Sequence, residues 1–198
     1  IIAVKPYKVK NILEEIKSHL IPEKHILISV ATGITLEEIQ NHLDNSLPVF
    51  RAMPNTASDV NESITCYCYS NANTKQIDIF NKVFSNVGAL SLIDEELMEA
   101  ATILGACGVA FVMRFIRAMI QGGIQIGFDS LTASKIVNQT VKGAAELLIE
   151  RNKHPEYEID KVTTPKGCTI VGLNEMEHNG FSSSLIKGIV SSFNKIEK

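Results

Sequence analysis

The run Val162–Leu173, VTTPKGCTIVGL, contains residues whose types and spacing could bind an anion. Pro165 and Gly167 interrupt the chain, and apolar spacing typical of a helix then resumes at Ile170. A helix that begins in this way presents unpaired backbone N–H groups and a partial positive charge, which can hold a carboxylate or a phosphate. The same residues also fit a plain turn without a ligand, and the run alone leaves both interpretations open.

Three other short segments follow expected strands and are further candidates for ligand binding. They are Lys5-Pro6, Thr32-Gly33 and Met53-Pro54-Asn55-Thr56. In open parallel sheets, ligands bind at the carboxyl ends of the strands. Loops at that edge, together with a helix N-terminus from elsewhere in the chain, indicate a cofactor on one side and an anionic substrate on the other. The residues by themselves are compatible with an α/β nucleotide-binding protein, without deciding for one, and they specify no reaction.

Groups for acid–base or metal chemistry are scarce. The five histidines have neither triad nor metal-ligand spacing. The cysteines are Cys66, Cys68, Cys107 and Cys168, and the first two would share one face of a strand, which is not the spacing of a zinc knuckle. We interpret all four as reduced thiols of a cytosolic protein.

The composition is that of a globular protein, with 198 residues of which 45% are hydrophobic and 21% charged. A formal net charge of −3 argues against a surface for nucleic acid or anionic membranes. The most apolar run, Val109–Ile120, contains Arg114 and Arg117 and is too short to span a bilayer. We therefore expect a buried helix there.

Up to about Ile93, short apolar runs alternate with amphipathic stretches. Thr35 is the expected N-cap of one helix, with Glu38 in the capping-box position. Alternation of strands and helices predicts a parallel α/β sheet. Strands are expected at residues 1–4, 25–31, 47–53, 63–69 and 89–93, and helices at 6–20, 35–43 and 74–86.

From Asp94 onward the pattern changes to one helix after another, which predicts an α/β domain at 1–93 and a helical domain at 94–198. The first of these helices opens with Glu95, Glu96 and Glu99, which we expect to form a solvated first turn. Helices that are apolar all round must be covered, so we expect packing against another subunit. The helices are expected at 94–104, at 108–121, after the capping residue Asp129, at 169–178 and at 181–196.

Six stretches of the sequence, in this order along the chain, resemble pyrroline-5-carboxylate reductases. The resemblance extends from the first residue to the last, and the TTPKGCT loop followed by a Gly-Phe turn is its most specific part. The stretches are AVKP (Ala3–Pro6), RAMPNT (Arg51–Thr56), GGIQIGF (Gly122–Phe128), QTVKGAAELL (Gln139–Leu148), HPEYEIDKVTTPKGCTIVGL (His154–Leu173) and NGFSSSLIKGI (Asn179–Ile189).

The resemblance implies an NAD(P)H-dependent enzyme that reduces pyrroline-5-carboxylate to proline, the last step of proline biosynthesis. It implies a Rossmann-type N-terminal domain, incomplete here, followed by an all-α dimerisation domain. The partners implied are the small-molecule substrate and further copies of the chain in a cytoplasmic homodimer or larger homo-oligomer, with no nucleic acid and no membrane. The hydride would pass from the nicotinamide to the imine carbon, so the cofactor supplies the difficult chemistry. The choice between NADPH and NADH stays open.

Carried over residue by residue, the resemblance assigns two groups of site residues. The nicotinamide and its ribose would be bordered by Ala3, Val4, Lys5, Pro6, Ala31, Thr32, Gly33, Met53, Pro54, Asn55 and Thr56. Backbone N–H groups of Gly167, Cys168 and Thr169 would hold the substrate carboxylate, and the Thr169 hydroxyl would act at the ring nitrogen as the catalytic group. Thr164 and Cys107 are weaker candidates for substrate contacts.

The sequence departs from the family pattern at two places. Where the family commonly has Ser-Gly-Ser-Gly-Pro-Ala-Tyr, this chain has Gly105–Phe111, GACGVAF, with a thiol at Cys107 in place of a hydroxyl. Lys166 stands where a second glycine is usual. In addition, we expect the family's glycine-rich G-x-G-x-x-G turn to precede Ile1.

Two alternative functions remain from the residues. One is a relative of the β-hydroxyacid and 6-phosphogluconate dehydrogenases, which use a Lys followed one turn later by an Asn. Here Asn138 precedes Lys142, so the order is reversed. The other is a non-catalytic dimerisation module.

Overall fold

The computed structural model describes residues 1–43 and 46–196. The chain forms two compact units, Ile1–Val109 with Ser191–Lys198, and Ala110–Val190. The division between them falls inside the helix α5 (Gly108–Gln125), whereas the sequence places a change of pattern at residues 93–94.

The first unit is built on a four-stranded sheet in the order β1-β2-β3-β4. Its strands are β1 (Leu27–Ser29), β2 (Val49–Met53), β3 (Ser63–Ser70) and β4 (Gly88–Leu92). β1 pairs with β2 and β3 with β4 in parallel, but β2 and β3 are antiparallel. The prediction of a wholly parallel sheet is therefore wrong. The connection 54–62 is too short for a crossover, which needs about a dozen residues or more.

The expected first strand is shorter than predicted. Ile2 alone forms a parallel bridge with Ser29, while Ile1 is exposed. The Ile2 N–H donates to Ile28 O at 2.7 Å, and Val30 N–H donates to Ile2 O at 3.0 Å. The chain leaves the sheet at once because Pro6 opens the next helix.

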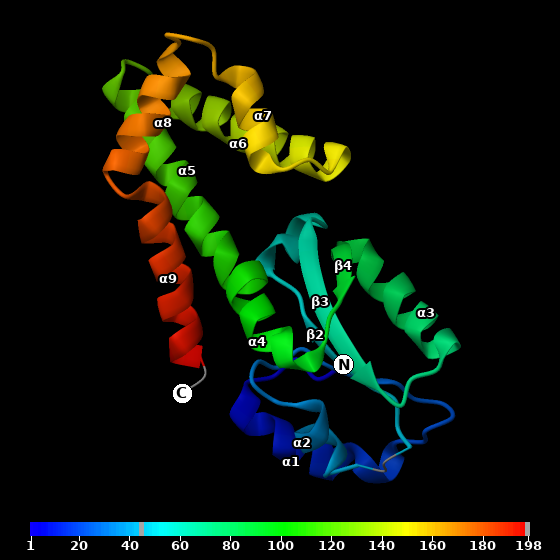
Figure 1. Ribbon diagram of the computed structural model, residues 1–198. Coiled ribbons are helices and arrows are strands. Elements are labelled where there is room, and N and C mark those ends of the chain that lie inside the picture. Colours follow the sequence, from blue (N-terminus) through cyan, green and yellow to red (C-terminus); the bar gives the residue numbers. More distant parts are fainter. Residues whose placement is uncertain (44–45, 197–198) are drawn as a thin grey trace. The chain divides into compact units, whose positions relative to one another are not determined.

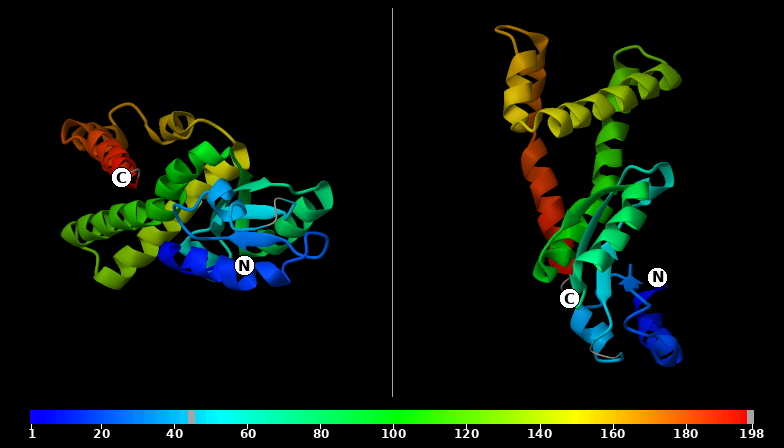
Figure 2. Two further views of the ribbon diagram at one scale, coloured as in Figure 1. Left: turned by 90° about the horizontal axis from the view of Figure 1, so that it is seen from below. Right: turned by 90° about the vertical axis from the view of Figure 1, so that its right-hand side faces the viewer.

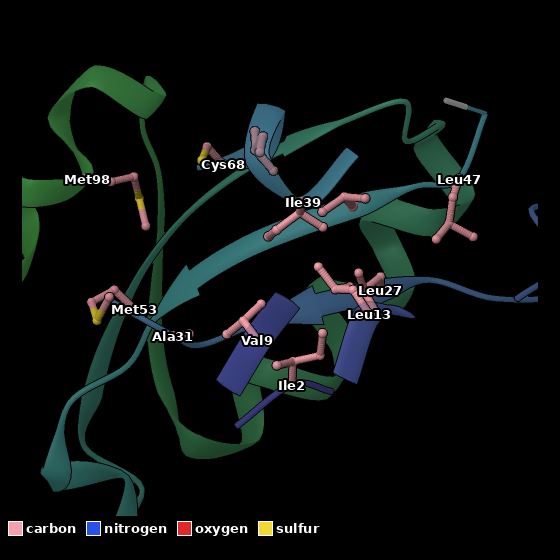
Figure 3. Packing of buried hydrophobic residues seen from close by; sticks show 12 residues of the cluster. Ile2, Val9, Leu13, Leu27, Ala31, Ile39, Leu47, Met53, Cys68 and Met98 are labelled. Atoms are coloured by element: carbon pink, nitrogen blue, oxygen red, sulfur yellow. The ribbon is translucent and has the colours of Figure 1, made fainter. Parts of the chain in front are cut away.

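Helices cover both faces of this sheet (Figure 1). α1 (Pro6–Ile16) and α2 (Leu36–Gln40) pack on one face, and α3 (Thr74–Phe84) packs on the other. Because side chains alternate along a strand, β2 sends Val49 and Met53 to the first face and Phe50 to the second. The first core is drawn in Figure 3, where side chains of α1 lie against β1 and β2. The second core is aromatic, with the Phe50 and Phe80 rings stacked 4.7 Å apart.

Short-range signals set the starts of these helices, whereas α1, α2 and α3 end earlier than the predicted residues 20, 43 and 86. Thr35 and Glu38 form the expected capping box at α2, and Asn73 with Gln76 forms another at α3. Short 3-10 turns complete the unit at η1 (Lys17–His19), η2 (Thr56–Val60), η3 (Ser85–Val87) and η4 (Glu95–Leu97).

The helices expected at 94–104 and 108–121 form one continuous helical stretch, Glu95–Gln125, so the predicted break is wrong. After η4 it consists of α4 (Met98–Ala101), a π-helical segment η5 (Thr102–Cys107) and α5. The residues between the two expected helices lie in this π-helical segment. By length and composition alone this stretch is apolar enough to cross a membrane, a weak criterion that core helices of soluble proteins also meet.

The prediction that α5 is buried is also wrong for the single chain. Only Ile120 of α5 is buried, whereas Met113 is 62% exposed. The second unit continues with α6 (Ser130–Arg151), α7 (Pro155–Val162), α8 (Cys168–His178) and the part of α9 (Phe181–Ile196) up to Val190. α7 was not predicted.

α5 and α6 are joined by a short loop, seen in the right-hand view of Figure 2. Asp129 caps α6 as expected, its carboxylate accepting from Leu131 N and Thr132 N at 3.0 Å. A Cβ on Gly123 would come within 3.2 Å of Ala133 Cβ, so the two helices approach closely there. The buried cluster of this unit contains Ile120, Ala133 and Val137.

We predict that Gly88→Ala destabilises the first unit by about 3 kcal/mol or more. Gly88 has φ +141°, and an added Cβ would lie 1.9 Å from the backbone oxygen of Ser63, its register partner on β3. Urea unfolding measures the loss. Gly33→Ala is the control, because Gly33 has φ +72° with no atom within 4 Å of the new Cβ. This variant should be destabilised only by the strain of a positive φ at alanine, which costs about 1–2 kcal/mol. Equal decreases in the free energy of unfolding of the two variants would contradict the steric explanation.

Candidate active site

The loops predicted to border a cofactor meet at one edge of the sheet in the first unit. Ile2, β1 and β2 run parallel, so the segments that follow them leave the sheet on the same side. The Thr32 hydroxyl donates to Met53 Sδ at 4.0 Å, which joins the second loop to the third. Ala31 and Met53 are both buried in the core cluster of Figure 3. The structure thus brings the predicted cofactor residues of this unit together.

The first of these loops opens α1. Lys5 is the N-cap, in an extended conformation and without a side-chain cap, and Pro6 is the first helical residue. Ala3, Val4 and Lys5 line a shallow pocket together with residues of α1 and of the segment after β1. This end of α1 therefore combines an uncapped helix N-terminus with an exposed recess.

The loop after β2 is held by hydrogen bonds at Asn55. Its side-chain Oδ1 accepts from Ala57 N at 2.9 Å and caps the 3-10 turn η2. Its backbone N–H donates to Ser63 Oγ at 2.9 Å, and its Nδ2 donates to Gly105 O at 3.0 Å. The loop is therefore tied both to β3 and to the π-helical segment η5.

Cys107 ends that π-helical segment and is half-buried. It lies two residues after Gly105, whose carbonyl accepts from Asn55. Cys107 thus belongs to the same unit as the cofactor loops, and its segment contacts one of them directly.

Residues 164–169 belong to the second unit and form a turn followed by a helix, as predicted. Gly167 N–H donates to Thr164 O at 2.9 Å, closing the turn. Gly167 is the N-cap of α8 and makes no side-chain cap. The first N–H groups of a helix have no partner within it, so those of Cys168 and Thr169 face outward for an acceptor. The N–H of Gly167 closes the turn in this structure, and the expected contact of Gly167 with the substrate stays a prediction.

The conformation of this turn explains why a glycine is usual at position 166. Lys166 has φ +61°, which L-residues adopt at a cost. Proline at the second position and a positive φ at the third are features of a type II turn. A Cβ on Gly167 would also lie 2.6 Å from Thr164 Oγ1, so the turn has no room for a side chain there.

A buried ion pair lies on the same strand as the third loop. Arg51 on β2 is 2% exposed, and its Nη1 and Nη2 donate to Glu95 Oε1 at 3.2 Å and Glu99 Oε1 at 2.5 Å. The expectation of a solvated first turn is therefore wrong for Glu95 and Glu99, whereas Glu96 is exposed as expected. A charged residue inside the otherwise apolar strand VFRAM was the signal that could have revealed the pair, since buried charges need partners.

The four cysteines are free thiols in different environments. Burial is the main cause that raises the pKa of the Cys68 thiol to about 12, and the carboxylate of Glu95 adds to it. Burial also raises the pKa of Cys66. Cys168 is exposed at the start of α8. Among residues 1–43 and 46–196, no group of three or more His, Cys, Asp or Glu side chains could hold a metal ion.

Comparison with known proteins identifies the family. Residues 95–198 match the family model described as pyrroline-5-carboxylate reductase dimerisation. Pyrroline-5-carboxylate reductase 1 of Dictyostelium discoideum is 47% identical, with 98% of this chain and 37% of that protein covered. Pyrroline-5-carboxylate reductase 2 of the same organism is 45% identical, with 100% of this chain and 71% of that protein covered. The chain belongs to the pyrroline-5-carboxylate reductase family.

Solved structures of pyrroline-5-carboxylate reductases have the same fold. The enzyme of Coxiella burnetii is 28% identical with a TM-score of 0.92, over 98% of this chain and 73% of that one. The enzyme of Plasmodium falciparum, solved with NADP bound, is 28% identical with a TM-score of 0.87, over 98% and 78%. The family and the two-part fold predicted from the sequence are confirmed. The roles of individual site residues stay predictions.

We predict that Lys166→Gly stabilises the protein by about 0.5–1 kcal/mol. Glycine removes the cost of the positive φ at Lys166, and this gain exceeds its larger loss of backbone entropy on folding. The midpoint of thermal unfolding is the measurement. Lys166→Ala is the matched control, because it removes the amine but keeps the Cβ. Equal shifts for the two variants would mean that the side chain, and not the backbone, determines the effect.

We predict that Cys168 is alkylated first by iodoacetamide at pH 8 and that Cys68 resists until the protein unfolds. A pKa of about 12 leaves about 1 in 10,000 Cys68 thiols ionised at pH 8, against about a quarter of ordinary thiols. Mass spectrometry of peptides gives the rate for each cysteine. In urea all four should react alike, and a native Cys68 that reacts as fast as Cys168 would disprove the prediction.

Proposed function

We propose that the full-length protein containing this chain reduces 1-pyrroline-5-carboxylate to L-proline with NADPH or NADH. The observation that carries the proposal is the family match over 98–100% of the chain to two proteins with this name. The arrangement of the residues agrees with it, since loops suited to a nucleotide lie in one unit and an uncapped helix N-terminus lies in the other.

The sheet edge of the first unit suits a nicotinamide nucleotide. At Gly33, positive φ and open space around the Cβ position leave the backbone accessible to a flat ring. NAD(P)H, when bound, supplies the hydride for the reaction. The residues proposed to hold it are Ala3, Val4, Lys5, Pro6, Ala31, Thr32, Gly33, Met53, Pro54 and Thr56, with Asn55 considered separately below.

The start of α8 suits the carboxylate of the substrate. The N–H groups of Cys168 and Thr169 would donate to it, and the helix dipole favours a negative charge at this end. The hydroxyl of Thr169 would hydrogen-bond the ring nitrogen and so orient the imine carbon. A protonated cyclic imine is already electrophilic, so the residues need to provide little acid–base chemistry. Thr164 and Cys107 have weaker claims to contact the substrate.

We further propose that the chain forms a homodimer or larger homo-oligomer through its helical half. The family model matched there is named for dimerisation. The exposed apolar side chains of the second unit supply the surface, because helices of this kind must be covered in water. The large residues among them include Val112, Met113, Ile124, Ile126, Leu131, Ile149, Val162, Val171, Ile186 and Val190.

A cytoplasmic location is also proposed. The argument rests on the cysteines, because Cys66, Cys68, Cys107 and Cys168 are all free thiols and free thiols are typical of reducing compartments.

The function is tested with the purified full-length protein by following oxidation of NADPH, and separately of NADH, on addition of pyrroline-5-carboxylate. We predict that Thr169→Val lowers kcat about tenfold to a hundredfold, because a hydrogen bond to a charged group contributes about 1.5–3 kcal/mol. Thr169→Ser should keep most of the activity. If the wild-type protein oxidises neither cofactor in the presence of this substrate, the proposal fails.

Thr163→Val is the matched control for this prediction. The hydroxyl of Thr163 donates to Ile159 O at 2.8 Å within the second unit, so the same substitution removes a hydroxyl that has no place in the proposed site. Its kcat should stay within about twofold of the wild type. A loss of kcat in Thr163→Val as large as in Thr169→Val would withdraw Thr169 from the mechanism.

A further inference from the structure

The polar groups of Asn55 are used inside the protein. Its backbone N–H donates to Ser63 Oγ, and its carbonyl accepts from Ser58 N at 3.1 Å. Its side chain accepts from Ala57 N with Oδ1 and donates to Gly105 O with Nδ2. The residue that the family resemblance assigns to the cofactor wall therefore directs its side chain into the protein.

The acceptor of Nδ2 belongs to a π-helical segment, a kind of turn that occurs frequently at functional sites. η5 spans Thr102–Cys107, and Gly105 lies between its two buried residues, Thr102 and Ile103, and Cys107. Gly105 is also close to β3, since a Cβ there would lie 3.5 Å from Ile64 Cγ2. A side-chain donor at this carbonyl therefore fixes where the segment lies relative to the sheet edge.

Arg51 joins the helical stretch Glu95–Gln125 to β2 at a second point, earlier in both segments. It reaches Glu95 and Glu99, and Asn55, four residues later, reaches Gly105. The two contacts follow each other in the same order along the strand with its loop and along the helical stretch. The two segments are therefore joined at two separate points.

We propose that Asn55 is a positioning residue, which ties the cofactor loop to the π-helical segment and so fixes Cys107 beside that loop. Its side chain does not bind the cofactor. The inference rests on the proposed reductase activity for its functional consequence. The tie itself is a property of the first unit alone.

The experiment compares Asn55→Ser with Asn73→Ser in the full-length protein. Serine is a good N-cap, so Asn55→Ser keeps the acceptor for Ala57 N but is too short to reach Gly105. Asn73 caps α3 in a similar way by accepting from Gln76 N, and this bond lies within the N-terminus of α3, so it is the matched control. Hydrogen–deuterium exchange of the peptide 102–108 reports the tie, and kcat and KM report its consequence.

Asn55→Ser should raise the exchange rate of residues 102–108 at least fivefold over wild type and over Asn73→Ser. It should lower kcat about tenfold or more, with the KM for NADPH within about twofold, because small displacements at a reacting centre are costly. A higher KM for NADPH with an unchanged kcat would overturn the proposal, since Asn55 would then bind the cofactor directly. Unchanged exchange, or faster exchange with unchanged kcat, would overturn it as well.

A second variant and a readout that is independent of turnover complete the experiment. If Asn55→Ser does not fold, Asn55→Asp has the same size, keeps the cap and replaces the Nδ2 donor by an oxygen facing Gly105 O, so the same criteria apply. The exchange measurement needs no turnover. An inactive wild-type protein would therefore reject the proposed function, while the exchange result still decides whether Asn55 holds the segment.

Discussion

The buried ion pair of Arg51 is the interaction on which the arrangement of the first unit depends. A guanidinium taken out of water is tolerated only where carboxylates compensate it, and here two of them do so from one helical turn. Glu95 Oε1 also accepts from Leu36 N at 2.7 Å, so a single carboxylate links β2, the helical stretch and α2. Removing one partner of such a pair costs about 3–5 kcal/mol, because the remaining charge stays buried. The helix has little freedom to slide along the sheet.

The antiparallel pairing of β2 and β3 brings a further anchoring residue to the sheet edge where the proposed cofactor loops lie. It brings Ser63, the first residue of β3, to the edge where β2 ends, and Ser63 there accepts from the backbone of Asn55. Gly88, the first residue of β4, pairs with Ser63 at the same edge, so close that a side chain would not fit. A wholly parallel sheet would have placed the start of β3 at the other edge. The pairing that the sequence did not predict is therefore what anchors the cofactor loop.

Features set by neighbouring residues were predictable, and those set by distant ones were not. The capping box of Thr35 and Glu38, the cap at Asp129 and the turn before α8 depend on residues within a few positions, and all three are found. The burial of Arg51 depends on glutamates more than forty positions away, and no local pattern reports such a partner. The continuous helix through Gly105 was missed because glycine lowers helix propensity, whereas tertiary contacts decide its conformation.

The second unit shows why association and the proposed substrate site belong together. Among residues 110–190, all of which the structure describes, the buried apolar side chains are Ile120, Ala133 and Val137. At about 25 cal/mol per Å² of buried apolar surface, so few side chains offset only a small part of the entropy lost on ordering the helices. Most of the remaining stabilisation must come from the exposed apolar surface of the same helices, once that surface is covered. Because Cys168 and Thr169 begin a helix of this unit, the geometry of their N–H groups depends on that coverage.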